Sequence, residues 1–213
     1  TITSVIPTLP LVTEQENNTG YRGQRITING TNFMANSTVN FNGTAAISVI
    51  FVNATQLTAL VNNTGANSLG VVTVTNPTTS ASATAPFSFI GYYTNAIGDW
   101  NSTATWLGSA LPTNNADATI AHVNTCAAAV TSSLHQVTIR QTGVLTFSTA
   151  NSSLLSEHVT NKGSIVFTGA GSLSISGDFI LTEESVFTPG NGRVNFTKEG
   201  DQVLFTGKST LSF

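Results

Sequence analysis

A repeat of about twenty residues is the feature that most restricts how this chain can fold. Phe147, Phe167 and Phe187 recur at steps of twenty residues, and each lies inside a short run of apolar and β-branched residues. A fixed step of this length is typical of stacked repeats, in which each repeat packs only on its neighbours. We therefore expect the second half of the chain to wind into a coil of short strands.

Two further apolar columns support the coil. The first keeps the same step, through Ile139, Val159 and Phe179, and a looser one runs through Leu155, Ile175 and Phe196. Stacked turns would lie about 4.8 Å apart in a parallel ladder. The pattern predicts a right-handed parallel β-solenoid (β-helix). Its predicted structural core consists of Phe147, Phe167, Phe187, Ile139, Val159 and Phe179.

Composition indicates an all-β protein and excludes several partners. Only 8% of the 213 residues are charged, and Thr, Ser, Asn and Gly fill the polar positions, which suits strands and turns better than helices. The formal net charge is −3, and basic residues do not cluster, so we expect no nucleic-acid partner. No apolar run approaches the ~18 residues of a spanning helix, so we expect no membrane insertion.

Residues 1–90 show a different pattern, with short apolar runs at roughly eight- to twelve-residue spacing. The strand candidates begin at Ile2 and continue at residues 26–28, 39–41, 47–52, 57–61, 71–75 and 87–90. Turn signals between them include Asn29-Gly30, Asn42-Gly43 and Asn63-Thr64-Gly65, because Asn and Gly tolerate the positive φ of tight turns. Seven short strands predict an immunoglobulin-like β-sandwich that lacks the usual cysteine pair.

Several separated segments of this region resemble one family. They are Gly23-Gln-Arg-Ile-Thr-Ile-Asn-Gly-Thr-Asn-Phe33, Val39-Asn-Phe-Asn-Gly43, Thr55-Gln-Leu-Thr-Ala-Leu-Val61, Gly70-Val-Val-Thr-Val-Thr-Asn76 and Phe87-Ser-Phe89. In this order they resemble an IPT/TIG domain over about residues 1–90. The resemblance implies a spacer or interaction module of surface proteins, adhesins, receptors or polysaccharide-active enzymes, and therefore a location more than a chemistry.

The predicted second domain, residues 91–213, begins with an aromatic segment. Tyr92, Tyr93, Trp100 and Trp106 lie close together in the sequence and are followed by Pro112. An open stack of turns needs a cover over its first apolar layer, so we interpret the segment as an aromatic N-terminal cap. The alternative is a glycan-stacking platform made by the same four rings.

The repeat region also resembles the repeat-rich surface proteins of Bacteroidetes-type bacteria that the type IX secretion system exports. The resemblance rests on residues 98–147, Ser176-Gly-Asp-Phe179, residues 187–196 and Asp201-Gln-Val203. It implies an extracellular or cell-surface location. Because Ser209-Thr-Leu-Ser-Phe213 begins another strand, we expect the solenoid to be truncated at its C-terminal end, where other copies of the chain or further domains would add.

Residues that carry chemistry are few and scattered. A β-helix enzyme would need clustered carboxylates, but the candidates are dispersed: Asp178, Glu183, Glu184, Arg193, Lys198, Glu199 and Asp201. His122, His135 and His158 have no i, i+2 or i, i+4 spacing, so no metal site is predicted. Asp99 leaves open a structural calcium at the domain junction. Cys126 is interpreted as a buried thiol without a reactive role.

The sequence therefore predicts a non-enzymatic protein without cofactors. We expect an extracellular or cell-surface stalk, filament segment or adhesin, in which a rigid repeat region carries the first domain. The alternative is a carbohydrate-binding accessory module of a secreted polysaccharide-active enzyme. Surface glycans are a further possible partner on that interpretation.

Overall fold

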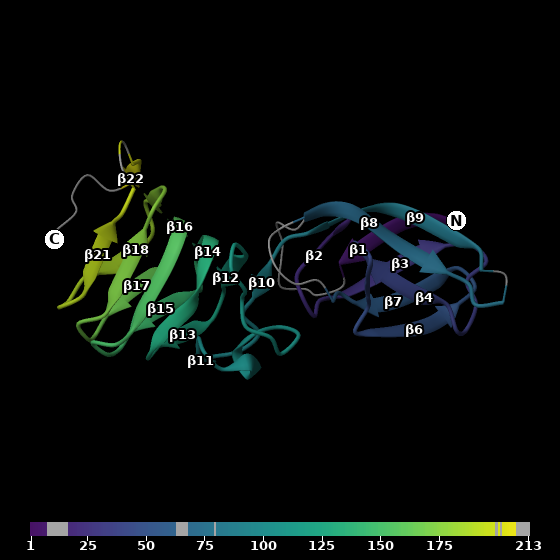
Figure 1. Ribbon diagram of the computed structural model, residues 1–213, viewed down its shortest axis with the longest axis horizontal. Helices are drawn as coiled ribbons and strands as arrows, with labels where there is room; N and C mark the ends of the chain where they lie inside the picture. The colour runs from purple at the N-terminus through teal and green to yellow at the C-terminus, as the bar shows by residue number, and fades with distance from the viewer. Residues whose placement is uncertain (8–16, 63–67, 79, 199, 201, 208–213) are drawn as a thin grey trace. The chain divides into compact units, whose positions relative to one another are not determined.

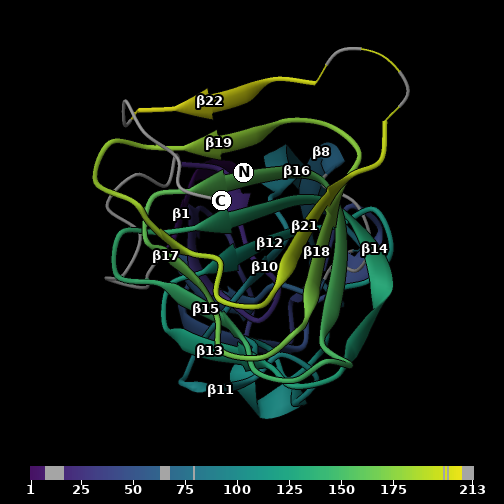
Figure 2. The same cartoon turned by 90° about the vertical axis from the view of Figure 1, so that its left-hand side faces the viewer.

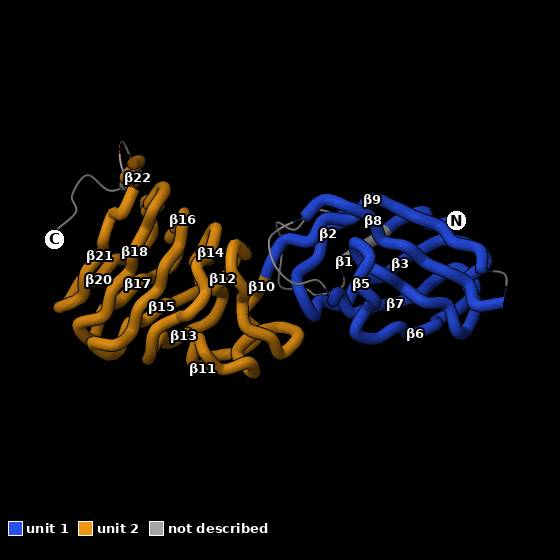
Figure 3. The backbone as a smooth tube through the Cα atoms, in the orientation of Figure 1, with its two compact units in different colours: residues 1–91 blue, residues 92–213 orange. Residues whose placement is uncertain are grey.

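The computed structural model describes residues 1–7, 17–62, 68–78, 80–198, 200 and 202–207. The chain divides into two compact units, Thr1–Gly91 and Tyr92–Phe213 (Figure 3). We call them the N-terminal unit and the solenoid unit. Helical structure in the described residues consists of one short 3-10 turn, η1 (Thr103–Thr105). The described part of the chain contains no helix with the length and apolarity needed to cross a membrane.

The N-terminal unit consists of two β-sheets (Figure 1). One sheet has the order β1-β3-β7-β6 and the other β2-β9-β8-β4-β5. The strands are β1 (Ile2–Pro7), β2 (Thr19–Gly20), β3 (Arg25–Gly30), β4 (Thr38–Phe41), β5 (Thr44–Ala45), β6 (Ser48–Asn53), β7 (Gln56–Leu60), β8 (Ser68–Thr75) and β9 (Ser82–Phe89). The predicted immunoglobulin-like sandwich is confirmed.

The core of this sandwich is formed by every second side chain of its strands. Along β3 every second residue is buried, so Ile26 and Ile28 face inward, as the period of two in a half-buried strand requires. Asn42 and Gly43 have positive φ, 50° and 83°, and join β4 to β5 in the predicted tight turn. A second predicted turn, Asn29-Gly30, is wrong because both residues lie within β3, and the third, Asn63-Thr64-Gly65, lies outside the described residues.

The solenoid unit is built from parallel strands that stack in about four turns (Figures 1 and 2). One ladder has the order β10-β12-β14-β16-β18-β21, and in it β19 also pairs with β16 and β22 pairs with β19; the other ladder has the order β11-β13-β15-β17-β20. The strands are β10 (Tyr92–Tyr93), β11 (Gly98–Asp99), β12 (Asp117–Ile120), β13 (Val123–Cys126), β14 (Ala129–Ile139), β15 (Val144–Phe147), β16 (Ser153–Asn161), β17 (Ser164–Phe167), β18 (Ser172–Ile175), β19 (Phe179–Leu181), β20 (Val186–Thr188), β21 (Arg193–Phe196) and β22 (Leu204–Thr206). The predicted β-solenoid is confirmed.

The Phe column agrees with the prediction over its first step only. Phe147 pairs with Phe167 in the ladder, and their rings stack at a centroid distance of 4.6 Å and an angle of 11°. Phe187, however, pairs with Ile165. Its ring meets that of Phe167 edge-on at 6.2 Å, and its side chain is half-buried rather than buried. The connection between β19 and β20 has two more residues than a twenty-residue step would give.

The other two columns also shift at one step each. Val159 pairs with Phe179 as predicted, but its partner on the previous turn is Val137. Ile139 pairs instead with Asn161, although all of these residues are buried. Ile175 pairs with Ser156 and Phe196, so Leu155 is not in the interior column and is 41% exposed.

Candidate functional site

The four aromatic residues proposed as a glycan platform are buried. Tyr92 and Tyr93 form β10, and Trp100 and Trp106 flank the short segment that contains η1. Both Trp side chains are 1% exposed, and the two Tyr side chains are at most 5% exposed. A sugar ring stacks only on an aromatic face that solvent can reach. The platform interpretation therefore has no open ring in this structure.

The same residues have the contacts expected of a cap. The indole rings of Trp100 and Trp106 meet edge to face with centroids 4.9 Å apart, and Nε1–H of Trp106 donates to the carbonyl of Trp100 at 2.8 Å. The backbone N–H of Trp100 donates to the carbonyl of Thr125 on the next turn at 2.7 Å. These bonds satisfy the polar atoms of two large buried rings and join the irregular first segment to the stack.

Asp99 directs both carboxylate oxygens to backbone amides. Oδ1 accepts from the N–H of Asn101 at 2.8 Å, and Oδ2 accepts from the N–H of Ala127 at 3.2 Å. The side chain thus fixes the loop after β11 and bonds to the next turn of the solenoid. These bonds give Asp99 a structural role in the first turn of the solenoid.

Cys126 is buried in the interior of the solenoid unit, as predicted. Its Sγ–H donates to the carbonyl of Ala128 at 3.1 Å. Burial, with a smaller contribution from the negative charge of Asp99, raises the pKa of the Cys126 thiol to about 12. The nucleophilic form of cysteine is the thiolate, so this side chain is unreactive at neutral pH.

The structure shows the partners of two of the scattered carboxylates. Asp178 lies beside His158, with Oδ2 3.5 Å from Nδ1. Glu184 accepts a hydrogen bond from Nε2 of Gln141 at 2.6 Å on the exposed surface. Glu199 and Asp201, which were also candidates, lie outside the described residues.

A bend in β14 and β16 places two consecutive side chains of each strand on the outside. In β14 the buried positions are Leu134 and Val137, three residues apart, and in β16 they are Ser156 and Val159. A regular strand would bury every second residue. The two residues between the buried positions therefore both face outward at this corner. They are His135 and Gln136 on β14, and Glu157 and His158 on β16.

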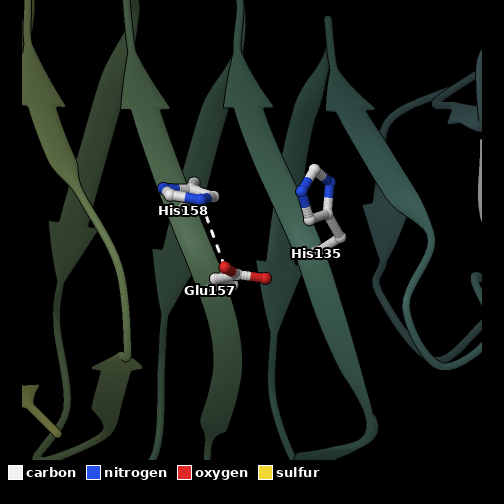
Figure 4. A group of neighbouring side chains, drawn as sticks. All are labelled: His135, Glu157 and His158. Carbon is white, nitrogen blue, oxygen red and sulfur yellow. Dashed lines mark ion pairs between the residues drawn. The ribbon is translucent and has the colours of Figure 1, made fainter. Parts of the chain in front are cut away.

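The register of the ladder brings three of these side chains together (Figure 4). Gln136 pairs with His158, which places His135 beside Glu157 on neighbouring turns. One nitrogen of each imidazole and one oxygen of Glu157 lie within 4.8 Å of one another. The rings of His135 and His158 meet at a centroid distance of 5.6 Å, and Oε1 of Glu157 is 3.4 Å from Nε2 of His158. We call these three residues the corner cluster.

Two aspartates flank the corner cluster on the turns before and after it. Nδ1 of His135 is 2.7 Å from Oδ1 of Asp117, a short charge-assisted contact in which the ring nitrogen donates. On the other side, Nδ1 of His158 accepts from the backbone N–H of Asp178 at 3.0 Å. Four successive turns thus present Asp117, His135, His158 and Asp178 along one corner.

The sequence did not predict this cluster, for a definite reason. The i, i+2 and i, i+4 spacings of metal ligands apply within one element, whereas His135 and His158 are on different turns and 23 positions apart. The bend that turns both Glu157 and His158 outward also contradicts the alternation expected of a strand. The gap of three positions between buried residues in both strands is the signal that could have located the corner.

Comparison with protein families identifies the N-terminal unit. Residues 1–89 match the family model described as IPT/TIG domain. The N-terminal unit is an IPT/TIG domain. Domains of this family occur in cell-surface and extracellular proteins. No curated protein and no solved structure matched the chain.

The IPT/TIG domain contains a small pocket without acid or base side chains. Its volume is about 130 Å³, below the ~300–1,000 Å³ of a typical small-molecule site. It is lined by residues 31–33, 74, 76 and 81–83 together with Thr1. The side chains around it are hydroxyls, amides and apolar groups, which offer no general acid or base.

Proposed function

We propose that the chain is a non-enzymatic structural or adhesive segment of an extracellular surface protein. The IPT/TIG domain supports this because domains of this family are found in cell-surface and extracellular proteins. In the proposed role, the solenoid acts as a stiff spacer of stacked turns that carries the IPT/TIG domain. Weak contacts made by many copies would then add through multivalency.

The observation that carries this proposal is the filled interior of the solenoid. Its inward side chains include apolar columns, such as Leu145, Ile165 and Phe187, with each member on the next turn. Such a stack buries a core that no single turn could bury. Packed columns of this kind suit a mechanical role, because a close-packed interior resists deformation.

The extracellular location is tested on intact cells of the source organism. Antibodies raised against the IPT/TIG domain should label unpermeabilised cells, and external protease should remove the epitope while a cytoplasmic marker survives. Labelling that appears only after permeabilisation would refute the proposal. Purified protein should also leave a panel of polysaccharides unhydrolysed, and measurable hydrolysis would contradict the non-enzymatic role.

We also propose that another copy of the chain covers the last described turn. Phe196 and Leu204 belong to interior columns, opposite Ile175 and Phe179. They are nevertheless 41% and 40% exposed. Apolar side chains and strand edges at the end of a stack are a template on which further strands add.

Association through this turn can be tested by sedimentation velocity over a range of concentrations. Phe196→Ser should lower the fraction of dimer or larger species. Leu155→Ser is the matched control, because Leu155 is also 41% exposed but lies on the outer face of β16. A monomer at all concentrations, or equal loss of association in both variants, would contradict the proposal.

A further inference from the structure

We propose that the corner cluster, His135, Glu157 and His158, is a binding site for a divalent transition-metal ion of the zinc class. Two imidazoles and one carboxylate are a donor set that zinc accepts, with a fourth position left for water or another ligand. This set distinguishes zinc from calcium and magnesium, which prefer oxygen ligands. The site lies on the outer surface of the solenoid and is independent of the proposed adhesive role.

The distances allow the three donors to close around one ion. In a tetrahedral zinc site with bonds of about 2.0–2.1 Å, neighbouring donor atoms lie roughly 3.4 Å apart. The donors of the corner cluster are within 4.8 Å of one another, so they must approach by about 1.4 Å. The side chains of His135, Glu157 and His158 are 44%, 50% and 32% exposed. They can make this movement by rotation of side chains without a change in the strands.

Asp117 already holds one ring in the state that binds a metal. Nδ1 of His135 contacts Oδ1 of Asp117 at 2.7 Å, so the proton of the neutral ring is held at Nδ1. The lone pair of His135 is then on Nε2. A carboxylate that orients a histidine from behind is the usual outer partner of a zinc ligand, and it raises the basicity of the coordinating nitrogen.

Asp178 can perform the same function for the second ring. Nδ1 of His158 accepts from the backbone N–H of Asp178, which places the ring proton on Nε2, beside Glu157. When Nε2 binds the metal, the neutral ring carries its proton on Nδ1 instead; Nδ1 gives up the hydrogen bond from the Asp178 N–H and donates to Oδ2 of Asp178, which lies 3.5 Å away. Nε2 of His158 then becomes the ligand atom. Asp178 is thus a positioning residue, and it should affect affinity without touching the ion.

A bound ion would join two successive turns of the solenoid. His135 is on β14, whereas Glu157 and His158 are on β16, and these strands are neighbours in the parallel ladder. An ion that binds only the folded arrangement stabilises it by mass action. The site therefore provides a crosslink between turns in a chain whose single cysteine cannot form an internal disulfide.

The test uses the full chain without a polyhistidine tag, titrated with ZnCl₂ by calorimetry and with CoCl₂ by visible absorption. We expect one zinc ion per chain, cobalt absorption bands typical of four-coordinate geometry, and a higher melting temperature with zinc. MgCl₂ and CaCl₂ should have no effect. Each of His135→Ala, His158→Ala and Glu157→Gln should weaken zinc binding at least tenfold.

Two further variants separate a built site from adventitious binding by any histidine. His122→Ala is the matched control, since His122 lies elsewhere in the solenoid, with Nδ1 3.1 Å from Oγ1 of Thr94, and it should bind zinc like the parent chain. Asp178→Asn should weaken zinc binding by a smaller factor than the ligand variants, because it removes only the negative charge that strengthens the hydrogen bond from Nδ1 of His158.

Several results would overturn the proposal. They are the absence of saturable binding at about 100 μM zinc, an equal loss of binding in His122→Ala, or parent-like affinity in Glu157→Gln. Glu157 is half-exposed, so Glu157→Gln should fold normally and decides the question even if a histidine variant is unstable.

Discussion

Truncation of Phe167 is the sharpest test of how the solenoid is packed. This side chain is 3% exposed, stacks on Phe147 at 4.6 Å and meets Phe187 edge-on at 6.2 Å. Gly192 on the next turn approaches the ring so closely that a Cβ at this position would collide with it, whereas a Cβ at Gly190 would collide with the backbone carbonyl of Phe167. Phe167→Ala should therefore leave a cavity that its neighbours fill only partly.

The expected cost is about 3–5 kcal/mol in the free energy of unfolding, the range for a large aromatic removed from a packed core. It includes the loss of ring contacts worth about 0.5–1.5 kcal/mol each. The matched control is Val166→Thr in the same strand, because Val166 faces outward and is only half-buried. Its cost should be under about 1 kcal/mol.

Tryptophan fluorescence in a urea titration measures this cost for the solenoid alone. The two tryptophans of the chain, Trp100 and Trp106, both belong to the solenoid unit, so unfolding of the IPT/TIG domain does not contribute directly. Equal costs for Phe167→Ala and Val166→Thr would show that the assignment of inner and outer faces is wrong. A cost below about 1 kcal/mol for Phe167→Ala would show that this column does not carry the core.

Three further predictions concern other parts of the chain. Cys126 should resist iodoacetamide at pH 8 until the chain unfolds. Because the pKa of its thiol is raised to about 12 from 9.0, the contribution of the neutral thiol to stability is complete below about pH 9 and is lost as the pH rises toward 12. Urea titrations across this pH range would show the loss. Gly143→Ala should lower the melting temperature far more than Gly43→Ala, the first followed by Trp fluorescence and the second by circular dichroism. A Cβ at Gly143 meets the carbonyl of Ile120, whereas Gly43 has open space and only a positive φ of 83°. Similar melting shifts would refute this. Residues 1–91 expressed alone should show a cooperative thermal transition, and a fragment without one would contradict an independent first unit.

Local chemistry made much of the fold predictable. Alternation and turn residues predicted the strands of the IPT/TIG domain, and a regular step predicted the stack that Phe147 and Phe167 form. Register failed where a turn changes length. Phe187 is opposite Ile165 because residues 182–185 form a longer corner, in which the hydroxyl of Ser185 bonds to the carbonyl of Thr182.

The site was less predictable than the fold because it depends on register. The corner cluster exists only because β14 and β16 bend at the same height and pair with a particular offset. A sequence pattern shows the residue types but not which turns lie side by side. Burial of Trp100 and Trp106 was predicted by the need to cover an open stack, so that part of the first segment followed from a physical requirement rather than from register.

The unequal turns of the solenoid determine where the chain can accept extra residues. One interior column runs through Tyr92, Ala118, Val137, Val159, Phe179 and Leu204, with steps of 26, 19, 22, 20 and 25 residues. Odd and even steps both return an inward side chain, so the corners absorb single insertions and deletions. One residue inserted inside a strand would instead turn every following side chain of that strand to the opposite face. Length variation between related chains should therefore be confined to the corners, and a whole extra turn should be easier to accommodate than one residue within β15 or β17.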